Sequence, residues 1–228
     1  MPEPASDGAP TGPEHRRRMQ PPAGRHTPHK EHPMPHRDPE RLRQIERTAA
    51  ELFGRSGYYA TSLQSLADAV GLTKAGLLHY VGSKDNLLTL VMRDVYDADA
   101  MAKLGADGND QPVGTVSLPG YLRDIVAQNA ERPHLVRLFT MLNTETLNPD
   151  HPARQYFQDR ERLLEHLADN PCWRIPEGVD VHATLNAAMM AMDGIQIKWL
   201  REPDRDLVAM WKQIEPALFP ETIWGPID

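Results

Sequence analysis

TSLQSLADAVGLTKAGLLHYVGSK, residues 61–84, decides the fold of this chain, because it holds two short helical patterns separated by a glycine. In the first pattern apolar residues recur at helical spacing, and Thr61 followed by Gln64 predicts a capping box. Gly71 is typical of the residue that ends a helix, and Thr73 is placed to cap the second helix. Two short helices joined in this way are typical of a helix-turn-helix, whose second helix enters the major groove of DNA.

The residue types in this stretch favour contact with DNA, although the spacing alone also fits a helical hairpin buried in an all-α domain. Lys74 stands in the first turn of the second helix, which reaches base edges in a helix-turn-helix, and its ammonium can donate to guanine or phosphate. The small residues Ala75 and Gly76 let that helix lie deep in the groove. The predicted DNA contacts are Thr61, Ser62, Thr73, Lys74, Ala75, Gly76, His79, Tyr80 and Lys84.

The run from about Arg41 to Val91, with AAELFGRSGYYATS, SLADAVGLTKAGLLHY and GSKDNLL, resembles the N-terminal DNA-binding domain of TetR-family transcriptional regulators. The resemblance implies an all-helical, dimeric repressor that responds to a ligand, and it implies that Lys84 lies beside a phosphate. Leu78 departs from the family, which usually carries there a residue able to reach phosphate. We therefore expect His79 and Tyr80 to supply the backbone contacts.

The distribution of charge agrees with a DNA-binding segment, although the whole chain has a net charge of −7. Residues 41–84 hold six Lys and Arg against three Asp and Glu, whereas residues 85–228 hold 13 against 23. Because salt screens charges over about 10 Å, a basic module on an acidic body can still bind phosphate.

The termini of the helices and the composition predict three regions. Residues 1–38, with nine prolines and five histidines, predict a disordered tail without a metal site. Residues 39–84 form the helix-turn-helix domain, whose first helix begins at Asp38 and Pro39 and is loosened at its end by Gly54 and Gly57. Residues 85–228 form a helical body for effector binding and dimerisation, in an all-α chain of about nine helices.

Body helices are expected over residues 119–130, from Pro133, from Ala153, over 181–200 and over 204–218. A fourth helix of the first module, capped by Ser83, is expected to continue through Val95 and link the module to the body. The single cysteine, Cys172, is interpreted as a packing residue. No run is apolar enough to span a membrane or to form a signal peptide, so the sequence predicts a cytoplasmic protein without a cofactor.

Two sets of residues in the body are assigned to binding. Polar groups on inward helix faces need partners, and flexible methionines adapt to apolar ligands, so both indicate an effector pocket. The pocket candidates are Phe139, Asn143, Tyr156, Asn186, Met189, Met190 and Asp193. Apolar stripes on the last two helices predict a homodimer interface, with burial inside one chain as the alternative. The interface candidates are Leu185, Met192, Trp199, Leu207, Met210, Trp211 and Ile214.

These patterns predict a homodimeric regulator that binds a palindromic operator and is released by an unknown small molecule. A regulator that activates, or one that has no effector, remains open within the same class. An all-α enzyme and a dimerisation module without DNA binding are the alternatives from other classes. The enzyme is disfavoured because no catalytic triad, metal-ligand spacing or phosphate-binding glycine loop is found.

Overall fold

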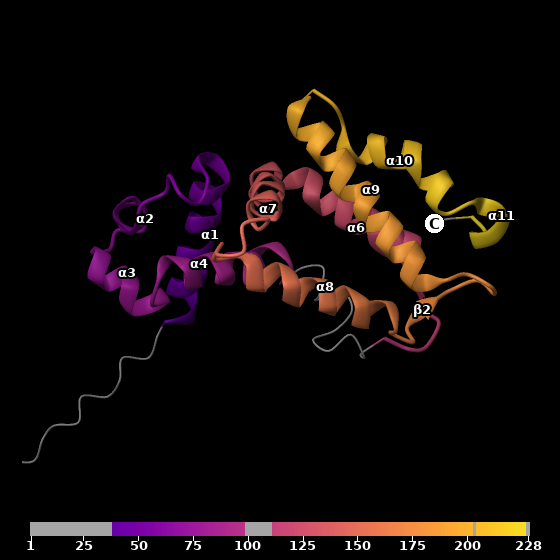
Figure 1. Ribbon diagram of the computed structural model, residues 1–228, viewed down its shortest axis with the longest axis horizontal. Coiled ribbons are helices and arrows are strands. Elements are labelled where there is room, and N and C mark those ends of the chain that lie inside the picture. Colours follow the sequence, from indigo (N-terminus) through magenta and orange to yellow (C-terminus); the bar gives the residue numbers. More distant parts are fainter. Residues whose placement is uncertain (1–37, 99–110, 203, 227–228) are drawn as a thin grey trace, which may run out of the picture. The chain divides into compact units, whose positions relative to one another are not determined.

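The computed structural model describes residues 38–98, 111–202 and 204–226, and the predicted N-terminal tail lies almost wholly outside them. The all-α fold with an N-terminal helix-turn-helix is confirmed, with ten α-helices among the described residues. They are α1 (Pro39–Ser56), α2 (Leu63–Ala69), α3 (Lys74–Val81), α4 (Lys84–Val91), α6 (Leu118–Glu131), α7 (Pro133–Glu145), α8 (Arg154–Ala168), α9 (Val181–Arg201), α10 (Leu207–Leu218) and α11 (Glu221–Trp224) (Figure 1).

Side-chain caps set the ends of the N-terminal helices. The carboxylate of Asp38 accepts from the N–H of Glu40 at 3.0 Å, and Pro39 opens α1 as predicted. Thr73 caps α3 and Ser83 caps α4, each accepting the backbone N–H three residues later. Each of these oxygens satisfies an N–H that has no partner inside the helix, which is worth about 1 kcal/mol per cap.

The start of α2 differs from the prediction by one residue. Ser62, not Thr61, is the N-cap, and it forms a reciprocal capping box with Ser65. Thr61 is only 3% exposed, and its hydroxyl donates to the carbonyl of Gly57 at 2.8 Å. Thr61 therefore closes the turn after α1.

Gly54 does not loosen the end of α1, because the helix continues to Ser56. A Cβ built at Gly54 would lie 2.4 Å from the carbonyl oxygen of His134, at the start of α7. Only a residue without a side chain lets the two helix backbones approach this closely. Gly57 does mark the end of the helix, with a positive φ of 82°.

Buried apolar residues form two cores. The first joins α1–α4 with Leu135, Leu138, Phe139 and Leu142 of α7 and with the start of α8. The second joins α6, α9 and α10 with Val136 of α7 and with the end of α8. Helix α7 thus contributes to both cores, and the N-terminal module packs directly on the body through it.

Four short elements in the described part of the chain, α11 among them, were not predicted. After α4 the chain continues as a π-helix, η1 (Met92–Tyr96), where the sequence predicted an uninterrupted helix. Farther on, β1 (Val116–Ser117) pairs in parallel with β2 (Trp173–Arg174). Two-residue strands carry too little side-chain pattern to be recognised from sequence. None of the helices in the described ranges is long and apolar enough to cross a membrane.

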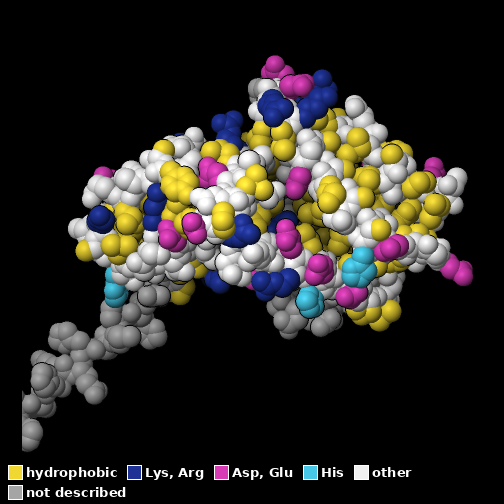
Figure 2. Space-filling view, in the orientation of Figure 1, with side chains coloured by type: hydrophobic (Ala, Val, Ile, Leu, Met, Phe, Trp, Pro, Cys, Tyr) yellow, Lys and Arg dark blue, Asp and Glu magenta, His cyan; other side chains and the backbone are white. Residues whose placement is uncertain are grey.

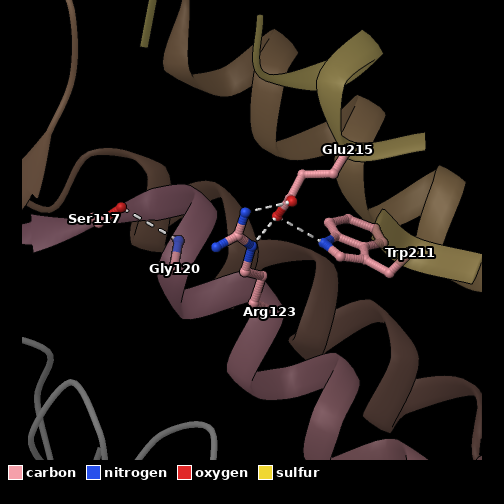
Figure 3. Close-up of polar contacts among 5 residues, drawn as sticks. All are labelled: Ser117, Gly120, Arg123, Trp211 and Glu215. Carbon is pink, nitrogen blue, oxygen red and sulfur yellow. Dashed lines mark hydrogen bonds and ion pairs between the residues drawn. The ribbon is translucent and has the colours of Figure 1, made fainter. Parts of the chain in front are cut away.

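A buried polar cluster ties α6 to α10. The guanidinium of Arg123 donates twice to the carboxylate of Glu215, at 2.6 and 2.7 Å, and the indole N–H of Trp211 donates to the same carboxylate at 3.1 Å (Figure 3). Glu215 is only 3% exposed, so its charge is stabilised by these donors.

The predicted dimer-interface residues lie inside the chain itself, so that assignment is wrong for all but one of them. Ile214 alone is partly exposed, and the others pack in the second core. Helix α10 packs on α6 and α9, and α9 also packs on α7 and α8. The buried residues are Leu185, Met192, Trp199, Leu207, Met210 and Trp211. Cys172 is also fully buried, in agreement with its interpretation as a packing residue.

Candidate nucleic-acid interface and ligand cavity

The first turn of α3 presents its residues to solvent. Thr73, Lys74 and Ala75 are exposed, and Gly76 is partly exposed. On the opposite side of the helix, Leu77 and Val81 are buried in the first core. This orientation leaves the Lys74 ammonium on the open face of the helix-turn-helix, where a phosphate or a base edge is reached.

The small size of Gly76 also serves the cap of α3. A Cβ at this position would lie 3.2 Å from the Thr73 hydroxyl oxygen, which accepts the Gly76 N–H at 3.0 Å. A larger residue would therefore press on the cap at the end of the helix that faces outward. At the far end of α3, the rings of His79 and Tyr80 are in edge contact, with His79 exposed and Tyr80 partly buried.

Thr61 and Ser62, which were predicted to contact phosphate together, have different surroundings. Ser62 is exposed at the N-terminus of α2, where free N–H groups attract anions. Thr61 is buried, with its hydroxyl directed inward to Gly57, so its predicted phosphate contact is wrong.

Lys84 lies in a small cluster beside the helix-turn-helix. Its ammonium is 4.2 Å from the centroid of the Tyr58 ring, and the Tyr58 hydroxyl donates to the carboxylate of Asp85. Burial lowers the pKa of Lys84, with Asp85 opposing that shift. The ring holds the lysine at the start of α4, and its contact with phosphate stays a prediction.

Two contacts that fix the module were not predicted. The Arg41 guanidinium donates to the carbonyl of Val70 at the end of α2, so Arg41 ties α1 to the turn before α3. His151, from the turn between α7 and α8, is 3% exposed and packs edge-on against the rings of Tyr58 and Tyr59. Neither contact has a local sequence signal, because each joins residues distant in the chain.

The body encloses a cavity of about 40 Å³ between α6, α8 and α9. Eight leucine, isoleucine and methionine side chains line it. Its polar lining residues are Asp97, Gln128, Asn129, Arg132, Arg160, Asp193 and Gln196, with Tyr96 and Tyr121 beside them. Asp97 accepts from the hydroxyl of Tyr156 at 2.5 Å and from Arg160 at 3.3 Å, so this carboxylate and this guanidinium neutralise each other.

Two of the predicted pocket residues, Met189 and Asp193, line this cavity. Phe139 and Tyr156 lie behind its wall, where Phe139 stacks on the Tyr96 ring at 4.8 Å. The other three candidates do not line it. Asn143 and Met190 are exposed on the outer faces of their helices, and Asn186 is exposed in a groove between α8 and α9.

The sequence analysis missed Arg160 and Gln196, and both carried a recognisable signal. Each interrupts an apolar stripe, Arg160 between Phe157 and Leu164 and Gln196 between Met192 and Trp199. A polar residue on a buried stripe needs a partner, which is the signature of an interior site.

The geometry of α1–α4 defines the chain as a helix-turn-helix protein. Residues 45–91 match the family model described as "Bacterial regulatory proteins, tetR family". The match covers the helix-turn-helix module, and together with the relatives it supports a transcriptional regulator of the TetR family.

Curated relatives match about half of this chain. The chain is 25% identical over 122 residues to the HTH-type transcriptional repressor KstR2 of Rhodococcus jostii, covering 54% of this chain and 49% of KstR2. It is 31% identical over 94 residues to the HTH-type transcriptional regulator RutR of Escherichia coli, covering 41% of this chain and 43% of RutR. The matched segment thus spans about half the length of these relatives.

Solved structures share the fold over a longer range. A regulator from Saccharomonospora viridis in complex with choline has a TM-score of 0.59 at 20% identity, covering 81% of this chain and 97% of that chain. The regulator FadR of Bacillus subtilis in complex with stearoyl-CoA has a TM-score of 0.59 at 16% identity, covering 81% and 99%. Salmonella enterica GusR has a TM-score of 0.60 at 17% identity, covering 79% and 96%. At these identities the likeness concerns the fold.

Proposed function

We propose that the protein is a homodimeric transcriptional repressor that binds a palindromic operator through α3 and is released by a small molecule bound in the body. The observation that carries the DNA-binding part is the open first turn of α3, where Lys74 is exposed on a capped helix whose other face is buried. The match of residues 45–91 to the TetR family supports it, as does the repressor KstR2 among the relatives.

The ligand-responsive part rests on the cavity in the body. Buried polar groups among apolar walls are typical of a small-molecule site. Two regulators of the same fold carry choline and stearoyl-CoA in their structures. The cavity also lies next to η1, since Tyr96 is one of its walls, and η1 continues directly from α4. A ligand that displaces Tyr96 therefore moves η1, and through η1 it moves α4, which packs against the other helices of the N-terminal module.

Fluorescence anisotropy with DNA from upstream of the protein's own gene, at two salt concentrations and against scrambled competitor, tests DNA binding. The variant Lys74→Ala should weaken binding, with a loss of up to about 3 kcal/mol for a base contact. If Lys74 instead contacts phosphate, the slope of log affinity against log salt should fall by about one per protomer. The control Lys212→Ala removes an exposed lysine from α10 and should bind as the wild type does.

Unchanged binding by the Lys74 variant would contradict the assignment of α3. If the wild-type protein bound neither this DNA nor any sequence from a genome-wide selection better than scrambled DNA, the regulator itself would be the wrong function.

We propose that the homodimer forms through the outer face of α9, and not through the apolar stripes of α9 and α10 that are buried inside the chain. Ala183, Ala187, Met190, Gly194 and Ile197 are exposed at alternating spacings of four and three residues, which places them along one side of the helix. Met190 is 66% and Ile197 37% exposed, and a Cβ at Gly194 would meet nothing. Hydrophobic side chains also gather over α9 and α10 on the face seen in Figure 2. Small and apolar residues in a row let a second helix approach closely.

Ile197→Glu should convert the dimer to a monomer, because it places a charge on this apolar face. Sedimentation velocity at several concentrations measures the change. Leu147→Glu, which alters a side chain that is 81% exposed after α7, is the matched control and should remain dimeric. An Ile197 variant that sediments as the wild type would exclude this face.

A further inference from the structure

An open groove lies beside the inner cavity. It runs between α8 and α9 and has a volume of about 460 Å³. The groove and the cavity share three apolar walls, Leu164, Leu185 and Met189. Side chains separate the two spaces, and an unbranched methionine moves at low cost. A ligand seated in the groove therefore reaches the cavity when Met189 changes its rotamer.

The groove is acidic at its mouth. Glu161 and Glu165 line it from the exposed side of α8, and neither forms an ion pair with another described residue. His182, on the α9 side, is paired with Asp169 at 2.7 Å. Figure 2 shows acidic side chains over the C-terminal half of α8 and beside α9. The mouth thus favours positive over negative ligands.

The inner end of the path offers hydrogen-bond acceptors. Gln196 is 1% exposed, and its Oε1 has no hydrogen-bond partner among the described residues. Asp193, one turn earlier on α9, lines the same cavity and forms no ion pair or hydrogen bond within the described part of the chain. A buried acceptor without a partner costs free energy, so a ligand that donates to it is favoured.

The two arginines of the cavity are already engaged. Arg160 is paired with Asp97 at 3.3 Å, and Arg132 donates to the carbonyl of Val95 at 3.2 Å. Of the two carboxylates that line the cavity, Asp97 is paired with an arginine and Asp193 is not, so Asp193 is the one that can pair with a ligand. Tyr96 and Tyr121 line the cavity as well, and the faces of aromatic rings attract organic cations.

We propose that the effector is an organic cation with an apolar chain, a protonated or quaternary amine whose charged group lies against Asp193 and whose chain lies along Leu164, Leu185 and Met189. This inference rests on the proposed function, because it names the class of effector for the same body site. A ligand carboxylate would meet like charges both at the mouth and inside.

Isothermal titration calorimetry with hexylammonium, which can donate to Gln196, and with butyl-, hexyl- and octyltrimethylammonium, which cannot, tests the proposal on the full-length protein without DNA. Hexanol and hexanoate are compared with them. We expect the ammonium ions to bind at least about tenfold more tightly than hexanol, and hexanoate to bind most weakly. Asp193→Asn should remove at least about tenfold of the affinity for the cation and leave hexanol unchanged. The control Asp204→Asn removes one negative charge as well, but from an exposed residue outside the groove and the cavity. It should bind the cation as the wild type does.

The proposal is overturned if hexanol or hexanoate binds as tightly as the ammonium ions, if no ammonium ion binds, or if Asp193→Asn leaves their affinity unchanged. A thermal melt of each variant confirms that it is folded. Adding hexyltrimethylammonium to the anisotropy assay then separates the two proposals. If the ligand-free protein does not bind DNA, the proposed function as a regulator is refuted. The calorimetry still decides the class of ligand in that case.

Discussion

In the N-terminal module the polar side chains assigned to function lie on the surface, whereas in the body they lie inside an apolar core. Lys74 is exposed on α3, and its helix is held by a cap and by buried leucine and valine on the other side. Asp193 and Gln196 lie among the leucines and methionines of the cavity. A surface site keeps its polar groups solvated until DNA arrives, while an interior site bears the cost of burying them at all times.

The difference shows how each region balances stability against binding. The N-terminal module can be rigid and have all its hydrogen-bonding groups paired or solvated, because DNA brings the phosphate and base contacts to its surface. The body has to hold unsatisfied acceptors next to a well-satisfied cluster, and Arg123, Trp211 and Glu215 show what full satisfaction looks like (Figure 3). The cluster should therefore stabilise the body, whereas Asp193 should destabilise it.

Glu215→Ala should have the largest effect on stability. It leaves the Arg123 guanidinium and the Trp211 N–H without the carboxylate they bind, and breaking a buried charged pair costs about 3–5 kcal/mol. Because Arg123 is 31% exposed at its side chain, water compensates part of the loss and the lower end is expected. Urea denaturation measures the change. The exposed Glu221→Ala is the control, and equal midpoints for the two variants would contradict a stabilising role of the cluster.

Gly54→Ala should come next, at about 1–3 kcal/mol, because its methyl group would meet the backbone of His134 and not a flexible side chain. The contact joins the two regions, so the variant should also weaken DNA binding by moving α1 relative to α7. Ser56→Ala, at the exposed end of the same helix, is the control and should change the stability by no more than about 0.5 kcal/mol. A Gly54 variant as stable as the wild type would contradict the close approach of the two helix backbones.

The module was predicted nearly residue by residue, because its signals are local. The caps at Asp38, Thr73 and Ser83 follow from the residue and its next three neighbours. Thr61 was predicted as the cap in place of Ser62 because both residues can cap and only the path of the turn decides between them. Gly54 was expected to loosen α1, because its close approach to His134 has no local signal.

The body was predicted less well, because its site depends on which helix faces which. The stripe containing Leu185, Met192 and Trp199 indicated correctly that this side of α9 is apolar, but a period of 3.6 residues does not tell whether α10 or a second chain covers it. The Asp97–Arg160 pair joins residues 63 positions apart, and no local pattern identifies such a contact.

Asp193→Asn should have the smallest effect and the opposite sign. Burial raises the pKa of Asp193 above the ordinary aspartate value of 3.8, and Arg160 opposes this only in part. The folded state therefore binds the proton more tightly than the unfolded state, so the stability of the wild type falls as the pH rises from about that value through the raised pKa, and then levels off. Asparagine carries no charge, so the variant should be the more stable protein at neutral pH.

The stability advantage of Asp193→Asn should amount to about 1.4 kcal/mol for each unit by which the pKa is raised. It should shrink as the pH approaches the ordinary range of a carboxyl group. Urea midpoints of both proteins across the acidic to neutral range measure this, with the exposed Asp204→Asn as the control. A variant less stable than the wild type at neutral pH would show that a favourable partner stabilises the ionised Asp193. The polar groups of the body's site would then be stabilised as well as those of the N-terminal module.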